Sequence, residues 1–532
     1  MKRILFAFFS AFFTGVMAQS PIAVQPIEGP VDFAGTFGEL RSHHFHSGVD
    51  IRTGGQTGWP VRAVQDGYLT RMVVRPDGFG WALYLRHSNG YTSVYAHLDD
   101  FKPEWHELAI ARATTNQSHR LDLYFGPGEF PVNAGDTIGW SGNSGGSAGP
   151  HLHFEWRDSR TEEPLNPFTY GLIYGEDSYS PRFIAIHTSD GQYATVTNGS
   201  WSRAIEISSW QDLSVEIRDK KHENGLNLGI QALKATWEWD QESFSMDFKM
   251  DRFPFDHTRC ADGLMQPEVH RIRGKRTYRL GPSLGLYPKW SESDTSIWHP
   301  RSYNLELTAV AANGEVVTIH GPVILSKTVD NRWHPEVAKQ NRYGSTGERI
   351  AGEMRVVWPE DCFTEPIRPN FVKKTDSEWQ ASPDVPVLKS LQYTWTPPVD
   401  YPEAWRAKTV LVGRDARGSY RIVGEPQQNG EIQFNMKIFG TVTLTRDLEA
   451  PVFSALRSAS FQGKVAKCLT LSDNMLDIID YRAFVDGNWT WSFYDAKNKR
   501  LYIPDFPSSA KALRVTATDE AGNVGVFITE FP

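Results

Sequence analysis

Short stretches in which apolar and polar residues alternate, separated by glycine-rich turns, run from residue 35 to about residue 168. Alternation with a period of two is typical of β-strands that bury one face. The stretch WALYLRHSNGYTSVYAHL places Asn89 and Gly90 between two such strands, and both residues accept the positive φ angles of a tight hairpin turn. The pattern predicts an antiparallel sheet whose second hairpin strand has two faces, with Ser93, Tyr95 and His97 on one and Thr92, Val94, Ala96 and Leu98 on the other.

A polar segment over residues 99–134 interrupts this pattern. It contains Trp105, His106 and His119, and its length leaves room for one short helix over residues 104–113. We expect this segment to be an insertion at the rim of the first domain.

Beyond residue 167 the chain becomes rich in tryptophan and tyrosine, and alternating strands end in clusters of Asn, Asp or Gly, as in SVEIRD, NLELTAVAANGEVVTIH and ALRVTATDEAGNVGVFI. This texture is typical of β-sandwich modules, so the predicted fold class is mostly β. Polar stretches at 327–347 and 372–387 are typical of linkers or long loops. We predict boundaries near residues 175, 340 and 450. They give a small antiparallel-sheet domain over 19–175, one or more β-sandwich modules over 176–340, a β-rich module over 341–450 and an immunoglobulin-like sandwich over 451–532.

The N-terminus has the pattern of a secretory signal. Lys2 and Arg3 precede an apolar run over residues 4–17, and small residues end at Ala18, so residues 1–18 are predicted to be cleaved on export to the periplasm, the cell envelope or the medium. The apolar run is shorter than the roughly 20 residues that span a bilayer, and no later stretch is long and apolar enough. Because the first cysteine is Cys260, we expect no lipid anchor next to the cleavage site.

Composition narrows the function further. The 55 basic and 63 acidic residues give a net charge of −8, which offers no basic footprint for a nucleic-acid partner. Cys260, Cys362 and Cys468 are too few for a thiolate metal site and allow at most one disulfide, whose pairing the sequence leaves open.

Two histidines one residue apart stand in SAGPHLHFEWR at 147–157. On a strand, His151 and His153 face the same side, while Leu152 and Phe154 pack on the other. The pair is equally consistent with a metal site and with a polar strand. Glu155 shares the histidine face, where it either orients a ligand imidazole or is solvated.

A second cluster, RSHHFHSGVDI at 41–51, contains His43, His44, His46 and Asp50 in a turn that enters a strand. Alone, this cluster is a metal site or a polar loop, and a lone strand histidine such as His97 is usually a surface residue or one whose hydrogen bonds are satisfied. The combination is more informative, because catalytic zinc commonly takes three protein ligands and leaves a position for water. His46, Asp50 and one histidine of HLH supply such a set. The other HLH histidine and His97 could accept a proton from water or stabilise an oxyanion, which together indicates an amide hydrolase.

Several motifs in this order resemble those of the lysostaphin/LytM-type zinc metallopeptidases, which cut peptide cross-links of bacterial peptidoglycan. They are HSGVDI, PVRAVQDGYL, GWALYLRHSNGYTSVYAHL, AGDTIGWSGNSGGSAGPHLHFE and PLNP, over about residues 41–168. The resemblance implies a Zn²⁺ cofactor with His46, Asp50 and His153 as ligands, and His97 and His151 as a catalytic pair. It also implies a narrow groove for peptidoglycan stem peptides or cross-bridges. The long 99–134 segment departs from the simplest members, and His44 could compete with His46, although only His46 stands four residues before the aspartate.

The resemblance leaves three functions to compare: an exported zinc endopeptidase, a catalytically silent relative that binds the wall or activates an amidase, and an adhesin that works through its sandwich modules. All five site positions are intact, which favours the enzyme. The modules are expected to hold it on the wall or on an envelope partner, and the arrangement is similar to that of large envelope peptidases of Bacteroidetes-like bacteria.

Overall fold

The computed structural model describes residues 22–532 except 30, 178, 202, 223–224, 266–276, 281–298, 327–344, 366, 416–417 and 455. The predicted signal over residues 1–18 and the predicted boundary near residue 340 lie outside the described residues, as does most of the polar stretch at 327–347. Within the described residues the chain is mostly β, which confirms the predicted fold class. No described helix combines the length and the apolar character needed to cross a membrane.

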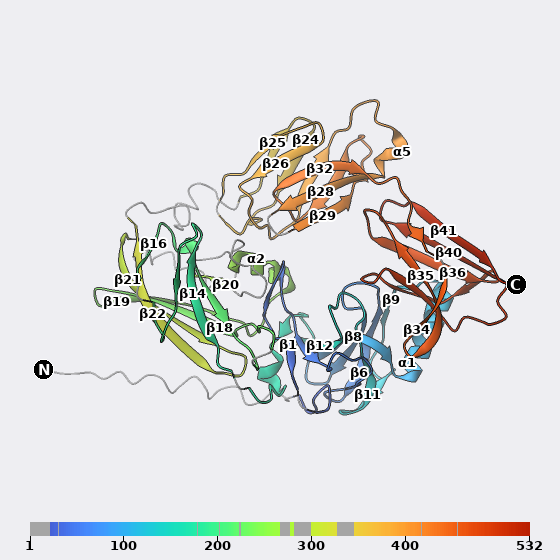
Figure 1. Cartoon of the computed structure of the whole chain (residues 1–532), viewed down its shortest axis with the longest axis horizontal. Coiled ribbons are helices and arrows are strands. Elements are labelled where there is room, and N and C mark those ends of the chain that lie inside the picture. The colour runs from blue at the N-terminus through green and yellow to red at the C-terminus, as the bar shows by residue number, and fades with distance from the viewer. Residues whose placement is uncertain are drawn as a thin grey trace.

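The first domain, over residues 22–174, is built on an 11-stranded sheet in which β1, β4, β12, β8, β7, β6 and β10 follow one another (Figure 1). All strand pairs in this sheet are antiparallel, as predicted. Its elements are β1 (Phe33–Gly35), β4 (Val49–Arg52), β5 (Pro60–Arg62), β6 (Gly67–Val74), β7 (Trp81–His87), β8 (Tyr91–Phe101), β9 (Leu121–Tyr124), β10 (Pro131–Val132), β11 (Thr137–Ser141), β12 (His151–Asp158) and β13 (Pro164–Leu165), with the small pair β2 (Leu40–Arg41) and β3 (His44–Phe45), helix α1 (Pro103–Asn116) and the 3-10 turn η1 (Pro167–Tyr170).

The 99–134 segment differs in part from the prediction. Helix α1 confirms the expected helix, but β9 and β10 both pair with β6 and widen the sheet. The segment is therefore built into the sheet as well as lying at its rim. It also contacts the C-terminal part of the chain, because both ring nitrogens of His119 lie within hydrogen-bonding distance of Ser492.

The second module, over residues 182–325, stacks two sheets. Its apolar side chains and those of the first domain form one continuous core, and every strand pair but the parallel β16–β22 pair is antiparallel. The elements are β14 (Arg182–Thr188), β15 (Tyr193–Thr195), β17 (Leu213–Arg218) and β20 (Thr277–Arg279) in one sheet, β16 (Ile205–Ile207), β18 (Ala232–Trp239), β19 (Glu242–Lys249), β21 (Arg301–Val310) and β22 (Val316–Leu325) in the other, and η2 (Trp210–Asp212), η3 (Phe255–Cys260) and α2 (Ala261–Leu264).

The third module, over residues 347–446, has two five-stranded sheets around its own core. The polar stretch at 372–387 contains β26 and is therefore not the loop that its composition predicts, since Trp379 and Ala381 are buried on one face of that strand. The elements are β23 (Gly347–Ala351), β24 (Met354–Trp358), β27 (Leu391–Trp395), β30 (Glu425–Pro426) and β31 (Ile432–Met436) in one sheet, β25 (Asn370–Lys373), β26 (Glu378–Ser382), β28 (Thr409–Asp415), β29 (Gly418–Val423) and β32 (Thr441–Arg446) in the other, and α5 (Glu403–Arg406).

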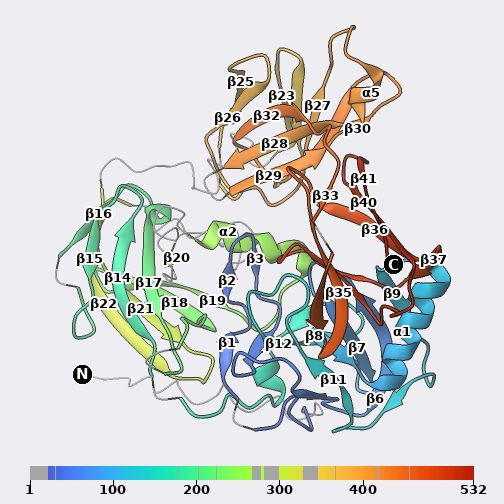
Figure 2. The ribbon, with the colours of Figure 1, turned by 45° about the vertical axis from the view of Figure 1, so that its right-hand side comes forward.

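The fourth module, over residues 452–532, returns to the first domain and packs beside α1 (Figure 2). Gln462 of this module donates a hydrogen bond to the backbone carbonyl of Asp99. The elements are β33 (Val452–Phe453), β34 (Arg457–Phe461), β35 (Lys464–Ser472), β38 (Phe493–Asp495) and β39 (Arg500–Pro504) in one sheet and β36 (Ile478–Val485), β37 (Asn488–Thr490), β40 (Ala512–Asp519) and β41 (Val524–Glu530) in the other. Cys260, Cys362 and Cys468 are buried, and no disulfide joins any of them among the described residues.

Candidate metal centre and active site

Strands β4 and β12 bring the two ligand motifs together. They pair antiparallel with His153 opposite Asp50, so two motifs about 100 residues apart in sequence meet on one face of the sheet. Alternation along β12 sends Leu152, Phe154 and Trp156 into the core and leaves His151, His153 and Glu155 on the other face, as the HLHFE pattern predicts.

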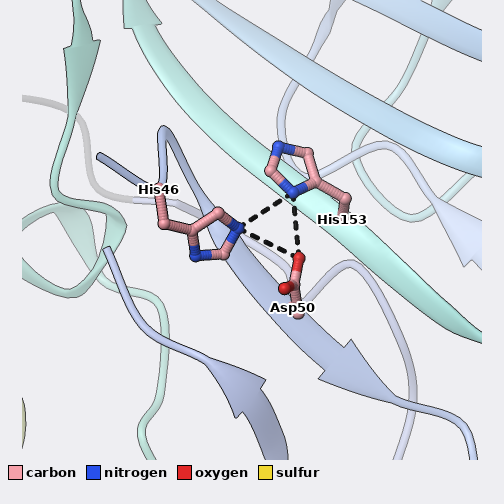
Figure 3. Close-up of side chains that lie close together, drawn as sticks. All are labelled: His46, Asp50 and His153. Carbon is pink, nitrogen blue, oxygen red and sulfur yellow. Dashed lines mark hydrogen bonds and ion pairs between the residues drawn. The ribbon is translucent and has the colours of Figure 1, made fainter. Parts of the chain in front are cut away.

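Three ligand atoms converge at this point (Figure 3). His46 Nε2 lies 3.0 Å from Asp50 Oδ1 and 3.1 Å from His153 Nδ1, and His153 Nδ1 lies 2.9 Å from Asp50 Oδ1. Atoms bonded at about 2.0–2.1 Å to a tetrahedral zinc ion lie about 3.3 Å apart, so the spacing needs little adjustment. The three side chains are at most 8% exposed, and they form a group that could hold a metal ion.

Hydrogen bonds on the outer side of each imidazole orient these atoms. His46 Nδ1 lies 2.8 Å from the carbonyl oxygen of Thr36 and must donate to it, which leaves the Nε2 lone pair facing the centre. His153 Nε2 lies 2.9 Å from Glu155 Oε1 and donates to that carboxylate, which leaves Nδ1 facing the centre. Such outer partners fix the tautomer of a metal-binding histidine. The donor set of two imidazole nitrogens and one carboxylate oxygen suits zinc.

The ionisation states of Asp50 and His153 also bear on whether the centre can bind a cation. Burial would raise the pKa of Asp50, but the neighbouring charges of His46 and Arg41 hold it well below its ordinary value, so this carboxylate is ionised. Arg41 Nη2 donates to Asp50 Oδ2 at 2.5 Å and leaves Oδ1 for the centre. Burial would lower the pKa of His153, but hydrogen bonds with Asp50 and Glu155 raise it to about 9. Without metal, His153 therefore carries a proton that a metal ion must displace.

His97 and His151 stand beside the three ligands. Their ring centroids lie 4.9 Å apart, and His151 Nε2 is 3.4 Å from Asp50 Oδ1. His97 Nδ1 donates to the carbonyl of Ser144 at 2.9 Å, and His151 Nδ1 to the carbonyl of Gly149 at 2.8 Å. Each ring therefore keeps Nε2 free to accept a proton. Burial and the charges of the neighbouring histidines lower the pKa of His97 to about 3, so this ring is neutral at physiological pH.

The predicted side-chain faces of β8 are wrong near its end. Tyr95 and Leu98 both enter the large core, although they are three residues apart, because the register with β7 shifts and His97 adopts a left-handed φ of 59°. This bulge releases His97 from the face of Ser93 and Tyr95 and turns its ring toward His151 and His153. Simple alternation contains no signal for it.

The loop over residues 141–149 supports His97. Ser144 Oγ donates to the carbonyl of Leu98 at 2.7 Å and accepts from the backbone N–H of Trp81 at 2.9 Å. Gly145 has φ of 66°, and a Cβ there would lie 2.4 Å from the backbone nitrogen of Gly80. The close approach requires glycine and fixes the Ser144 carbonyl that orients His97.

The comparisons with known proteins agree with this geometry. Residues 44–107, which include His46, Asp50 and His97, match the profile of Peptidase family M23. The chain is 34% identical over 133 residues to the DD-carboxypeptidase/endopeptidase Mpg of Neisseria meningitidis, a match that covers 25% of this chain and 24% of that protein. This chain contains an M23 peptidase domain.

Two further likenesses cover a similar share of the chain. Glycyl-glycine endopeptidase ALE-1 of Staphylococcus capitis is 29% identical over 141 residues, which cover 25% of this chain and 32% of that protein. The catalytic domain of lysostaphin from Staphylococcus simulans matches at 22% identity and a TM-score of 0.20, covering 26% of this chain and 91% of that chain. The chain thus spans only about a quarter to a third of the length of these curated relatives.

Apart from His119, which contacts Ser492 of the fourth module, four other histidines of the first domain lie outside the centre. His43 pairs with Asp262 at 3.0 Å, and the ring of His44, a strand-end residue exposed to solvent, bonds the carbonyl of Ser42. His87 lies within 2.8 Å of the Ser93 hydroxyl, and His106 pairs with Asp100 at 2.6 Å. None of these four supplies a ligand atom to the group of His46, Asp50 and His153.

Three contacts of the M23 site were missed by sequence reasoning. Arg41 is bound to Asp50, one of the three candidate ligands. Thr36 orients His46 through its backbone, which has no residue-type signal. Lys497 of the fourth module donates to the carbonyls of Asn143 and Ser147, so a residue about 350 positions away steadies the supporting loop.

Proposed function

We propose that this chain is an exported, zinc-dependent endopeptidase that hydrolyses peptide cross-links of bacterial peptidoglycan. The observation that carries the proposal is the convergence of three buried ligand atoms, from His46, Asp50 and His153, with the free Nε2 side of His97 and His151. The names of the relatives, a carboxypeptidase/endopeptidase and a glycyl-glycine endopeptidase, support a peptide bond of the wall as the target. The charged and apolar pattern of residues 1–18 supports export.

The reaction needs a nucleophile, a polarised carbonyl and a proton carrier. When bound by His46, Asp50 and His153, zinc acidifies water and polarises a carbonyl oxygen. Nε2 of His151 or His97 accepts the proton from the attacking water, because Nδ1 of each ring is committed to a backbone carbonyl. When the C–N bond breaks, the same nitrogen returns the proton to the leaving amine.

The fourth module contributes to the surroundings of this site. A cavity of about 180 Å³ between the modules is lined by Asp99, Asn143 and Ser144 on one side and Gln462 and Lys497 on the other. Because Asn143 and Ser144 belong to the loop that supports His97, the cavity adjoins the proposed groove. We propose that the fourth module helps to select the substrate and to hold the enzyme on the wall or on an envelope partner.

Digestion of purified peptidoglycan tests the function. We would measure the zinc content of the full chain and the muropeptides released by wild type and by His151→Ala, each with and without zinc. Release that requires both zinc and His151 supports the endopeptidase. Zinc bound at one equivalent without release from several wall types would overturn it and favour a silent relative that binds the wall or activates an amidase.

A further inference from the structure

The third and fourth modules meet at a small apolar contact. Val410 and Val412 of β28 pack with Leu476 and Ala521 of the fourth module, where the two modules adjoin in Figure 2. Lys408 Nζ crosses the same junction and donates to the carbonyl of Ala521 and to Asn523 Oδ1, each at 2.7 Å. These contacts join the third module to the fourth.

Three aspartates gather beside this contact. Asp447 directly follows β32, the last strand of the third module, whereas Asp473 follows β35 and Asp519 ends β40 in the fourth module, so the group lies at the junction of the two modules. One carboxylate oxygen from each lies within 4.8 Å of the others. Asp447 and Asp519 are 0% exposed and Asp473 is half-buried.

Two of the buried oxygens in this group have no hydrogen-bond partner among the residues that the structure describes. Asp447 Oδ2 and Asp473 Oδ2 are both buried and unpartnered, whereas the other oxygens accept from backbone and Asn523 N–H groups. No ion pair among the described residues joins any of these carboxylates to a lysine, arginine or histidine. Lys408, the lysine at this junction, donates its hydrogen bonds to Ala521 and Asn523. A buried charge without a partner is costly, so the group requires a cation or a proton.

The donor chemistry distinguishes between metals. The group offers carboxylate oxygens and no nitrogen or sulfur, which suits a hard cation rather than zinc. Oxygens bonded to one calcium ion at about 2.3–2.6 Å lie at most about 5 Å apart. One oxygen of each of the three carboxylates lies within 4.8 Å of the others, so the three are close enough to share such an ion. Burial raises the pKa of Asp447, and the negative charges of Asp473 and Asp519 raise it further.

We propose that Asp447, Asp473 and Asp519 bind a calcium ion that fixes the third module against the fourth. This site is separate from the zinc centre. Because the fourth module contacts the loop that supports His97, calcium would also steady that module's approach to the groove.

Calcium titration of the full chain tests the proposal, with calorimetry for stoichiometry and thermal unfolding for stability. Wild type should bind one calcium ion, and Asp50→Ala, which lacks a zinc ligand, should bind calcium equally well. Asp447→Asn should raise the calcium Kd at least tenfold and, since it removes one of three like charges, should melt above wild type when metal is absent. Asp376→Asn, an exposed aspartate of the third module, is the matched control and should bind as wild type does.

The proposal is overturned if wild type binds no calcium up to millimolar concentrations, or if Asp447→Asn binds calcium as tightly as wild type does. Preference for magnesium over calcium would overturn the assignment of the ion. Should Asp447→Asn fail to fold, Asp473→Asn, whose side chain is half-buried, is measured in its place against the same expectation.

Discussion

Replacing Glu155 by glutamine removes one negative charge next to the proposed zinc site and changes the shape of the side chain little. The Glu155 side chain is 0% exposed and accepts from His153 Nε2 at 2.9 Å, while its second oxygen pairs with Arg157, whose side chain is 8% exposed. Burial would raise the pKa of Glu155, yet Arg157 and His153 lower it to about 2. Glutamine keeps the shape and one acceptor oxygen, but it turns an amide toward the Arg157 guanidinium.

Two effects of Glu155→Gln follow from these contacts. Removing one partner of a buried ion pair costs about 3–5 kcal/mol, and Glu162, 3.5 Å from Arg157, offers a substitute partner that favours the lower end. A loss of about 3 kcal/mol lowers the hydrogen-exchange protection of β12 roughly a hundredfold. The second effect is on metal, because loss of the carboxylate that orients a ligand imidazole costs about 10–100-fold in zinc affinity.

Hydrogen exchange of the β12 amides and competition with a zinc chelator measure these two effects. Glu162→Gln is the matched control, since Glu162 touches the same arginine but its side chain is 55% exposed. It should cost less than about 1 kcal/mol and leave zinc affinity unchanged. The reasoning is refuted if Glu155→Gln retains wild-type exchange and zinc affinity, or if Glu162→Gln causes the same losses.

Other predictions concern the site directly. Asp50→Ala and His153→Ala should abolish stoichiometric zinc by metal analysis, whereas His97→Ala should keep zinc and slow muropeptide release about a hundredfold or more; one equivalent of zinc in Asp50→Ala would contradict the ligand assignment. Zinc competes with a proton on His153, whose pKa is raised to about 9 by hydrogen bonds with two carboxylates despite burial. Below pH 9, the apparent zinc affinity should therefore increase about tenfold for each unit by which the pH is raised. Chelator titrations that give the same zinc affinity at every pH would exclude this competition. Gly145→Ala should slow release without loss of zinc because its Cβ would meet backbone at 2.4 Å, while Gly146→Ala, with 3.4 Å of clearance, should match wild type.

Much of the site could be predicted because its signals are local. The spacing of four between His46 and Asp50 and of two between His151 and His153 places these residues on particular strand faces, and strand periodicity is a short-range property. Glu155 carried the same signal, since it continues the face of His153, and the structure places its carboxylate on that ring.

The features of the fold and the site that the sequence does not predict depend on contacts between segments far apart in the chain. Lys497 meets the loop at Asn143 and Ser147 only after the fourth module has folded back onto the first domain. The left-handed backbone at His97 depends on the register between β7 and β8. Strand β26 lies in a stretch of polar composition, and the burial of Trp379 against its own module overrides that local signal.

The central claim is that this chain breaks a peptide bond of the wall by adding water at the metal centre. Digestion of purified cross-linked muropeptides in ¹⁸O-labelled water, followed by mass spectrometry, tests it most directly. The account predicts that the zinc-loaded wild type releases a new amine and a carboxylate carrying one ¹⁸O atom, and that His151→Ala, still holding zinc, releases neither. Unlabelled or purely glycan products, or equal cleavage by His151→Ala, would contradict it.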